Sequence, residues 1–262
     1  MKRALILAAG KGQRLGELTA TKPKCLLQLT HENTVLDLLL DTIAKVKIKE
    51  IIIISGFANE YLKDYLSKKW ASKFVFKIIN NPKYSEYNNI YSAYLAKDLW
   101  DDETILFNSD IVFDPAILNL LATKIKNNSA QSYLVVDNYQ ELTEEDMKVT
   151  VNESGQISRI HKSLDINSSF GEYIGITYLR GKTRLKFIES LENNIKANNL
   201  DLYYEDALDQ IASQISVFPC STNGNLWTEI DTKEDYELAK NIAKKIYEPN
   251  KYTDKTSYSS FK

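Results

Sequence analysis

The sequence predicts an α/β protein built on an open, mostly parallel sheet flanked by helices, and three observations support this fold class. Apolar runs of strand length alternate with amphipathic runs of helix length across the first half of the chain, which is the pattern of βαβ units. The run Ile51–Ser55 is apolar and β-branched, as expected of a strand that a parallel sheet buries on both faces. The first strand, Arg3–Ala9, leads into a glycine-rich loop, a Rossmann-like arrangement in which the loop lies at the ligand-binding edge of the sheet.

The first half of the chain supplies the parallel sheet and its helices. Thr34–Val46 carries apolar side chains at helical spacing. Pro115 directly after Asp114 predicts the first position of a capped helix. The expected strands are Arg3–Ala9, Ile51–Ser55, Phe74–Ile79, Thr104–Phe107 and Tyr133–Val136, and the expected helices are Thr34–Val46, Asn59–Lys69, Asn89–Lys97 and Pro115–Ile125.

The second half changes pattern and predicts a small β insertion. Asn152–Gly155 reads as a hairpin turn between two short strands. With no repeat and no linker rich in Gly, Pro or Ser, residues 1–247 are expected to form a single domain, and the polar, aperiodic residues 248–262 a flexible tail. The expected strands are Lys148–Val151, Gln156–Ile160, Tyr173–Tyr178 and Ile215–Phe218, the expected helices are Arg184–Ala197, Glu205–Ser213 and Lys233–Lys245, and Trp227–Ile230 is a further segment before the last helix.

The composition excludes several classes of protein. The chain has 262 residues, of which 44% are hydrophobic and 26% charged, so it can bury a core and is not wholly disordered. Its net charge of -2 gives no basic surface for nucleic acid. The apolar stretch at the N-terminus is too short for a signal peptide or a membrane span. Cys25 and Cys220 form no disulfide framework and suit a reducing cytoplasm, where we expect the protein to act.

The most informative segment is the loop Leu7-Ala8-Ala9-Gly10-Lys11-Gly12-Gln13-Arg14-Leu15-Gly16. Gly10 and Gly12 let the backbone approach a ligand, and successive N–H groups can form an anion-binding nest. Lys11 and Arg14 add positive charge, so the loop is suited to the phosphates of a nucleotide. It fits neither the dinucleotide fingerprint, because Leu15 holds the place of the third glycine, nor the P-loop. The alternative is a tight surface turn with solvated charges.

A second motif follows in Thr21–Leu26, where Pro23 stiffens the chain ahead of Lys24. With a Leu-Ala-Ala-Gly-x-Gly-x-Arg loop followed by a Pro-Lys pair, the sequence resembles the nucleoside-triphosphate transferase family. The resemblance implies a fold of the nucleotide-diphospho-sugar transferase type, with Lys24 and Arg14 as catalytic residues. It also implies a loop that binds the nucleotide, formed by Leu7, Ala8, Ala9, Gly10, Lys11 and Gly12.

Two aspartates correspond to the metal ligands of that family. Asp110 follows the predicted strand Thr104–Phe107, and Asp231 precedes the last predicted helix. Nucleotidyl transfer needs a divalent cation, and Mg²⁺ prefers oxygen ligands, commonly one or two carboxylates. The resemblance therefore implies a Mg²⁺ site held by Asp110 and Asp231. The alternatives are a solvated turn for Asp110 and a helix cap for Asp231.

The stretch Asn81–Ser92 narrows the branch of the family. It contains Asn-Asn-Ile-Tyr-Ser and looks like the corresponding segment of the phosphocholine cytidylyltransferase group. An asparagine amide offers a donor and an acceptor that can read cytosine, so Asn89, and with less support Asn88 and Ser92, are candidate nucleotide contacts. The alternative is a helix start capped by Asn88 with Tyr91 packed beneath.

The acceptor side rests on weaker signals. The resemblance makes Lys162 the candidate for contacting substrate phosphate, with Lys148 as a second candidate and a surface lysine as the alternative. Tyr173 and Trp227 can enclose a quaternary ammonium by cation–π contact, although packing is the default for aromatics. Glu205, with Asp206 beside it, can pair with an amine or simply occupy the first turn of a helix.

Together these observations predict a Mg²⁺-dependent cytidylyltransferase that joins CTP to a small phosphorylated or phosphonylated amine or alcohol and releases pyrophosphate. His31 and His161 have no metal-ligand spacing, and no nucleophile with a base partner stands out, which fits direct in-line attack by the acceptor. Phosphocholine, aminoethylphosphonate, phosphoglutamine and inositol phosphate all remain open as acceptors, as does a monomer or a homodimer. The alternatives are a sugar-1-phosphate nucleotidyltransferase using UTP or dTTP and a non-catalytic nucleotide-binding module.

Overall fold

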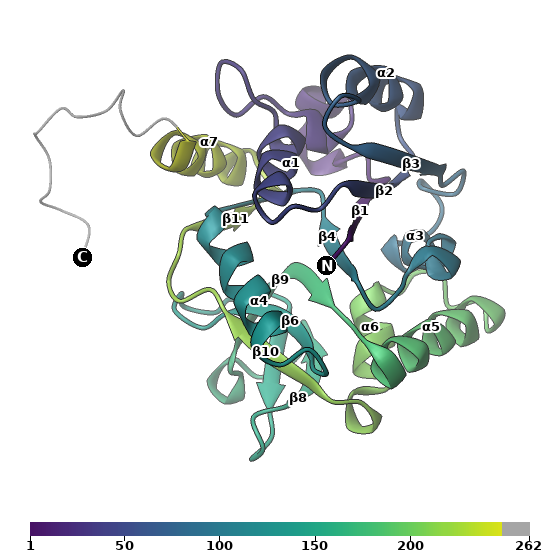
Figure 1. Cartoon of the computed structure of the whole chain (residues 1–262), viewed down its shortest axis with the longest axis vertical. Coiled ribbons are helices and arrows are strands. Elements are labelled where there is room, and N and C mark those ends of the chain that lie inside the picture. The colour runs from purple at the N-terminus through teal and green to yellow at the C-terminus, as the bar shows by residue number, and fades with distance from the viewer. Residues whose placement is uncertain (248–262) are drawn as a thin grey trace, which may run out of the picture.

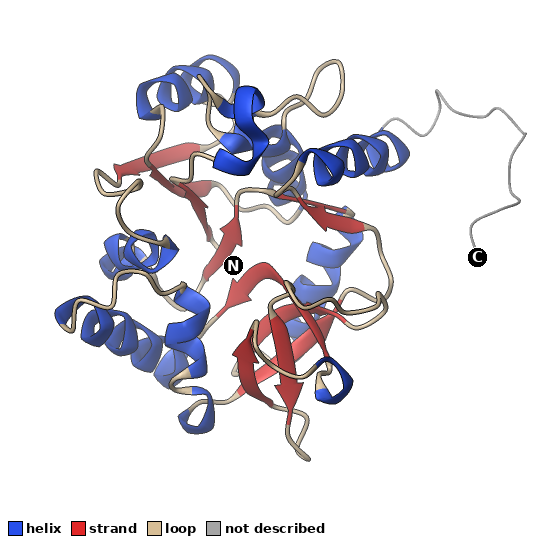
Figure 2. Cartoon of the chain, turned by 180° about the vertical axis from the view of Figure 1, so that it is seen from behind, coloured by secondary structure: helices blue, strands red, loops and turns tan. Residues whose placement is uncertain are grey.

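A mostly parallel sheet runs through the centre of the computed structural model, which describes residues 1–247 (Figures 1 and 2). Its strands follow the order β10-β6-β9-β4-β1-β2-β3, and the hairpin β7-β8 attaches beside β9. The strands are β1 (Arg3–Ala8), β2 (Glu50–Ser55), β3 (Val75–Asn80), β4 (Thr104–Asn108), β6 (Ser132–Asp137), β7 (Lys148–Val151), β8 (Ile157–His161), β9 (Gly171–Tyr178) and β10 (Val217–Ser221). The predicted α/β fold class and the small β insertion are confirmed.

The directions of strand pairing show which edge of the sheet is expected to bind ligands. β1 pairs in parallel with both β2 and β4, and β6 pairs in parallel with β10. β9 runs antiparallel between β4 and β6, so β4 and β6 point the same way. The carboxyl ends of β1, β4 and β6 therefore meet the amino end of β9 at one edge, where α/β sheets bind ligands.

Helices cover both faces of the sheet (Figures 1 and 2). One buried cluster joins the sheet to α1, α2 and α4, and a second joins it to α3, α5 and α6. A smaller cluster packs α7 against α1. No helix within residues 1–247 is both long and apolar enough to cross a membrane. The helices are α1 (Val35–Lys45), α2 (Asn59–Lys69), α3 (Asn89–Leu95), α4 (Pro115–Asn127), α5 (Gly181–Lys196), α6 (Tyr204–Asp209) and α7 (Lys233–Tyr247).

The structure departs from the sequence expectation mainly at short elements. A separate antiparallel ribbon of β5 (Ile111–Phe113) and β11 (Trp227–Glu229) was expected only in part, because three-residue strands carry no readable period. Helix α6 ends at Asp209, before the expected Ser213, and a 3₁₀ turn follows. The cap on α4 is confirmed, since the Asp114 carboxylate accepts from the Ala116 N–H at 2.8 Å. The expected tail, residues 248–262, lies outside the described residues.

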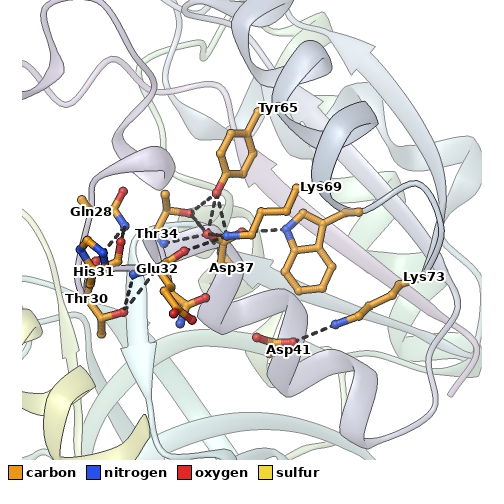
Figure 3. Close-up of polar contacts among 12 residues, drawn as sticks. Gln28, Thr30, His31, Glu32, Thr34, Asp37, Asp41, Tyr65, Lys69 and Lys73 are labelled. Atoms are coloured by element: carbon orange, nitrogen blue, oxygen red, sulfur yellow. Dashed lines mark hydrogen bonds and ion pairs between the residues drawn. The ribbon is translucent and has the colours of Figure 1, made fainter. Parts of the chain in front are cut away.

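A buried carboxylate joins α1 to α2 (Figure 3). Asp37 is 0% exposed, and its Oδ1 accepts from the Trp70 indole at 2.7 Å. Its Oδ2 accepts from the Lys69 ammonium at 2.7 Å and the Tyr65 hydroxyl at 2.5 Å. Thr34 completes a capping box with Asp37 at the start of α1. Burial alone would raise the pKa of Asp37, but hydrogen bonds led by that from Lys69 outweigh it and lower this pKa.

Candidate nucleotide and metal site

The glycine loop leaves β1 at the edge of the sheet expected to bind ligands and closes onto Lys24. Gly12 has φ of +68°, in the left-handed region that favours glycine. A Cβ at Gly12 would lie 3.2 Å from the Cβ of Lys24, and the Thr19 hydroxyl fixes the loop by donating to the Gly12 carbonyl at 2.8 Å. Glycine at position 12 therefore permits both the turn and the close packing of the Lys24 side chain.

The side chains of the loop differ in what they offer a ligand. Leu7, Ala8 and Ala9 are buried, so they present backbone groups only. Gly10, Lys11 and Arg14 are exposed, and the Lys11 ammonium lies 5.4 Å from the centre of the Phe57 ring. A polyanion at this loop would meet exposed backbone together with the two exposed cationic side chains of Lys11 and Arg14.

The β5–β11 ribbon brings the two predicted metal aspartates together. Asp110 stands just before β5 and Asp231 shortly after β11, and Glu229 pairs with Ile111 in the antiparallel register. The Ile230 N–H donates to the Asp110 carbonyl at 3.0 Å. Because antiparallel strands place one strand's start opposite the other's end, the two aspartates meet although they are far apart in sequence.

Glu229 joins the two aspartates, and sequence reasoning missed it. One carboxylate oxygen each of Asp110, Glu229 and Asp231 lies within 4.8 Å of the others. Burial, followed by the charges of the two aspartates, raises the pKa of Glu229 well above its usual value. The available signal was the Glu-x-Asp spacing at the end of the segment Trp227–Ile230, because residues two apart in an extended chain point to the same side; in the structure β11 ends at Glu229 and Asp231 lies just beyond it.

Lys24 bridges the aspartates. Its Nζ lies 2.8 Å from Asp110 Oδ2 and 2.8 Å from Asp231 Oδ1, and its side chain is 11% exposed. Burial alone would lower the pKa of Lys24, but the charges of Asp110 and Asp231 outweigh it and raise this pKa. Arg14 adds a contact from its Nη2 to Asp231 Oδ2 at 2.7 Å. Burial would raise the pKa of Asp231, yet the Lys24 charge dominates the lowering influences and the net shift is downward.

The carboxylate set fits a hard divalent cation. Three oxygens within 4.8 Å of one another form a donor set that Mg²⁺ accepts. Asp110 Oδ1 is buried and has no hydrogen-bond partner among residues 1–247, which leaves it available as a ligand atom. The arrangement can neutralise a polyphosphate through Lys24, Arg14 and a cation held by these carboxylates.

Asp231 does not cap α7. The Thr232 hydroxyl accepts from the Asp235 N–H at 3.2 Å, and Asp235 Oδ2 accepts from the N–H groups of Asp231 and Thr232 at 3.0 and 2.7 Å. These residues form the cap, so the Asp231 carboxylate remains directed at Lys24 and Arg14.

The predicted base-reading segment has a clear structural role. Asn88 caps α3, its side chain accepting from the Asn89 N–H at 2.7 Å. Asn89 Oδ1 accepts from the Tyr204 N–H at 2.8 Å, which ties α3 to α6. Ser92 is 3% exposed and its hydroxyl accepts from the buried Asn81 amide at 3.0 Å, a placement that argues against the predicted nucleotide contact.

On the acceptor side, α6 and β8 lie side by side. The Lys162 ammonium lies 5.8 Å from the centre of the half-exposed Tyr203 ring, beside the start of α6. Glu205, in the first turn of α6, is 4% exposed, and within residues 1–247 its Oε2 has no hydrogen-bond partner. Burial raises the pKa of Glu205 to about 7. Asp206 is engaged at the start of α6, where it accepts from the Tyr203 N–H at 2.7 Å.

Three acceptor candidates are buried, and their polar atoms bind other groups of the protein, which favours the packing alternative. Tyr173 is 3% exposed and shares a hydrogen bond with the Tyr204 hydroxyl at 2.8 Å. Trp227 is 6% exposed and donates to Asp137 at 3.0 Å. Lys148 is 0% exposed and donates to three backbone carbonyls of the loop before β7. Alternation along a strand showed which face these residues occupy, but not that this face is packed.

Glu172 is a further carboxyl that sequence reasoning did not single out. It lies at the start of β9 and pairs in register with Asp137 and Lys148. Burial, then the charges of Asp146 and Asp137, raise the pKa of Glu172 to about 8, while Lys148 and Lys162 oppose the rise. Its place beside Lys162 makes it a neighbour of the predicted acceptor side.

Comparisons with known proteins agree with this geometry. A protein-family model described as Nucleotidyl transferase matches residues 3–161, which is more than half of the chain. The chain is 26% identical to a choline-phosphate cytidylyltransferase from Streptococcus pneumoniae, over 92% of this chain and 98% of that protein. It is 28% identical to one from Haemophilus influenzae, over 89% and 94% respectively. A solved CTP:phosphocholine cytidylyltransferase from Streptococcus pneumoniae matches with a TM-score of 0.76 at 24% identity, covering 92% of this chain and 99% of that one, which shows the shared fold.

Proposed function

Because the chain belongs to the nucleotidyl transferase family, we propose that it is a Mg²⁺-dependent cytidylyltransferase. It transfers CMP from CTP to a small phosphorylated or phosphonylated amine or alcohol of the phosphocholine type and releases pyrophosphate. The observation that carries the proposal is the meeting of the glycine loop, Lys24, Asp110, Glu229 and Asp231 at one edge of the sheet. The similarity to two choline-phosphate cytidylyltransferases over most of their length supports CTP as the donor.

The donor half of the reaction rests on the loop and the cationic side chains. The backbone at Gly10 and Gly12, with Lys11 and Arg14, holds the triphosphate. Lys24 neutralises negative charge near the α-phosphate. Mg²⁺, held by Asp110, Glu229 and Asp231, would supply charge neutralisation to the triphosphate.

The chemical step needs little proton transfer. An acceptor phosphate oxygen forms a bond to the α-phosphorus, the bond from that phosphorus to the bridging oxygen breaks, and pyrophosphate leaves with the electron pair. A phosphate monoester is already anionic at neutral pH, so no general base is required. Catalysis then depends on positioning and charge neutralisation, which Lys24 and Arg14, both within contact distance of Asp231, supply next to the glycine loop.

The acceptor half is assigned to Lys162 and Glu205. Lys162 provides positive charge for the acceptor phosphate, and Glu205 Oε2, which has no hydrogen-bond partner among residues 1–247, is available to bind an amine. Asn89 contacts the nucleotide through its amide nitrogen, since its oxygen already binds α6. Residues 1–247 act as one catalytic domain, and the buried thiols Cys25 and Cys220 suit a reducing cytoplasm.

A panel assay tests the proposal. The protein is incubated with Mg²⁺, each of CTP, UTP, dTTP, ATP and GTP, and each of phosphocholine, aminoethylphosphonate, phosphoglutamine and inositol phosphate. Pyrophosphate release and product mass are measured. We expect release with CTP and a CMP-linked product. Turnover only with UTP or dTTP and a sugar 1-phosphate would establish the sugar-nucleotide alternative, and tight CTP binding without any release would indicate a non-catalytic module.

A further inference from the structure

The ammonium of Lys24 lies between Asp110 and Asp231, the two aspartates that would hold a metal ion. It contacts one oxygen of Asp110 and one of Asp231, both at 2.8 Å. Arg14 engages the second oxygen of Asp231 at 2.7 Å. Of the four oxygens on these aspartates, three contact a protein cation, and the fourth, Asp110 Oδ1, is buried without a partner within residues 1–247.

These contacts compete directly with a divalent cation. The Lys24 side chain is 11% exposed and that of Asp110 22%, so the pair is less screened than a surface ion pair. To bind here, a free metal ion must lose part of its hydration shell. It must also displace the Lys24 ammonium from the carboxylates of Asp110 and Asp231. The displaced ammonium would stay in a partly buried pocket without a counter-charge, which is unfavourable.

A polyphosphate removes this obstacle. The Lys24 side chain packs against Gly12, so it runs alongside the loop that is proposed to hold the triphosphate. An anion on that loop offers Lys24 a second partner within reach of a change in side-chain rotamer. Arg14 belongs to the same loop and can leave Asp231 for the same anion.

We propose that Lys24 is the resident counter-ion of the carboxylate site, so that a divalent metal ion is bound poorly alone and well together with a triphosphate. Metal and nucleotide then enter as one chelate, and Lys24 passes from the aspartates to the phosphates as the chelate enters. The inference rests on the proposed function for the identity of the anion, but its first half, exclusion of free metal by Lys24, does not.

Direct binding of Mn²⁺, followed by electron paramagnetic resonance of the free ion, tests the exclusion. Wild type is compared with Lys24→Met, which keeps the length of the side chain but not its charge. Lys11→Met is the matched control, because Lys11 carries the same charge beside the same loop but lies over Phe57 and not between the aspartates. We expect Lys24→Met to bind Mn²⁺ alone at least about tenfold more tightly than wild type, and Lys11→Met to stay within about twofold, because only Lys24 is linked to metal binding.

The second measurement needs no variant. In wild type, a non-hydrolysable CTP analogue should tighten Mn²⁺ binding at least about tenfold beyond the chelation measured without protein, the positive coupling that reciprocal linkage requires. Equal Mn²⁺ affinity in wild type and Lys24→Met, or no Mn²⁺ binding by either, overturns the counter-ion role. Tighter binding by Lys24→Met without any effect of the analogue keeps that role and overturns CTP as the anion, so the two failures are distinguishable.

Discussion

Two clusters, around the buried Asp37 and the partly buried Asp110, show how the same residue type serves stability in one place and ligand binding in another. At Asp37 both carboxylate oxygens have donors, from Trp70 on one side and Lys69 and Tyr65 on the other. At Asp110 one oxygen contacts Lys24, and the other has no partner within residues 1–247. Two more acids stand beside Asp110, whereas donors surround Asp37. A satisfied carboxylate stabilises the fold, and an unsatisfied one among like charges is kept for a ligand.

The largest expected effect concerns the satisfied cluster. Asp37→Ala leaves the buried Trp70 N–H without its acceptor, which costs about 1–3 kcal/mol, and it also removes the capping box of α1, worth about 1 kcal/mol, and one of the partners of the partly exposed Lys69 ammonium. Urea unfolding measures the loss of stability. Asp41→Ala is the control, since Asp41 is a partly exposed residue of α1 whose ion pair with Lys73 spans 3.4 Å, and its loss should cost less than about 1 kcal/mol. Equal stability of the two variants would remove the distinction between the clusters.

The unsatisfied cluster should respond in the opposite way. Asp110→Ala removes a ligand for the cation and a partner of Lys24, so turnover should fall by roughly a hundredfold or more, the scale of one lost charge contact in a transition state. Stability should be unchanged or higher, because repulsion with Glu229 and Asp231 is relieved. Steady-state kinetics and a thermal melt measure the two outcomes. Near-normal turnover would remove Asp110 from the catalytic site, and loss of the folded state would show that it serves the fold.

These two clusters also mark how far the sequence could be interpreted. The alternation of strand and helix lengths predicted the sheet, and the position of Asp110 just past a strand end predicted that it lies at the same edge as the glycine loop. The Glu-x-Asp spacing relates Glu229 to Asp231, but that both meet Asp110 follows only from the register of the β5–β11 ribbon. The Asp37 cluster could not be predicted, because its donors come from α2 and their spacing in sequence carries no signal.

The burial of the two aromatic candidates, Tyr173 and Trp227, was hidden from the sequence for a related reason. Period-two alternation places Tyr173 on one face of β9, but whether that face meets a helix or a ligand depends on tertiary packing. The Tyr173 hydroxyl meets Tyr204 of α6, and the Trp227 indole meets Asp137 of β6. Both contacts join segments distant in sequence, so only the folded chain reveals them.

Glu205 allows a test of whether the acceptor side resembles the unsatisfied cluster. Burial raises the pKa of this carboxyl to about 7, so it is largely neutral below pH 7 and charged above it. If it pairs with an amine, kcat/KM for the amine-bearing acceptor should fall about tenfold per pH unit below that pKa, because only the carboxylate binds the cation. The pH profile of kcat/KM for CTP should not show this fall below the pKa of Glu205.

Glu205→Gln is the matched variant for the pH profile. It keeps the shape of the side chain but cannot ionise, so the limb near pH 7 should vanish while any limb from Glu172, whose pKa is about 8, remains. An unchanged profile in Glu205→Gln would assign the titration to Glu172 or another group. Glu205 would then join Asp37 as a structural carboxyl.

The smallest expected effect comes from removing the capping box alone, which separates its contribution from the other contacts of Asp37. Thr34→Ala removes the hydroxyl that accepts from the Asp37 N–H at 3.2 Å, and loss of such a cap costs about 1 kcal/mol. Asp37 keeps Trp70, Lys69 and Tyr65, so the loss should be well below that of Asp37→Ala, and Thr34→Ser should recover most of it. The double variant should lose less than the sum of the single losses, because the two side chains satisfy each other's backbone N–H groups. Strict additivity in urea unfolding would mean that the capping box and the ion pair stabilise α1 independently. The stabilising role of Asp37 would then depend only on its donors from the α2 side.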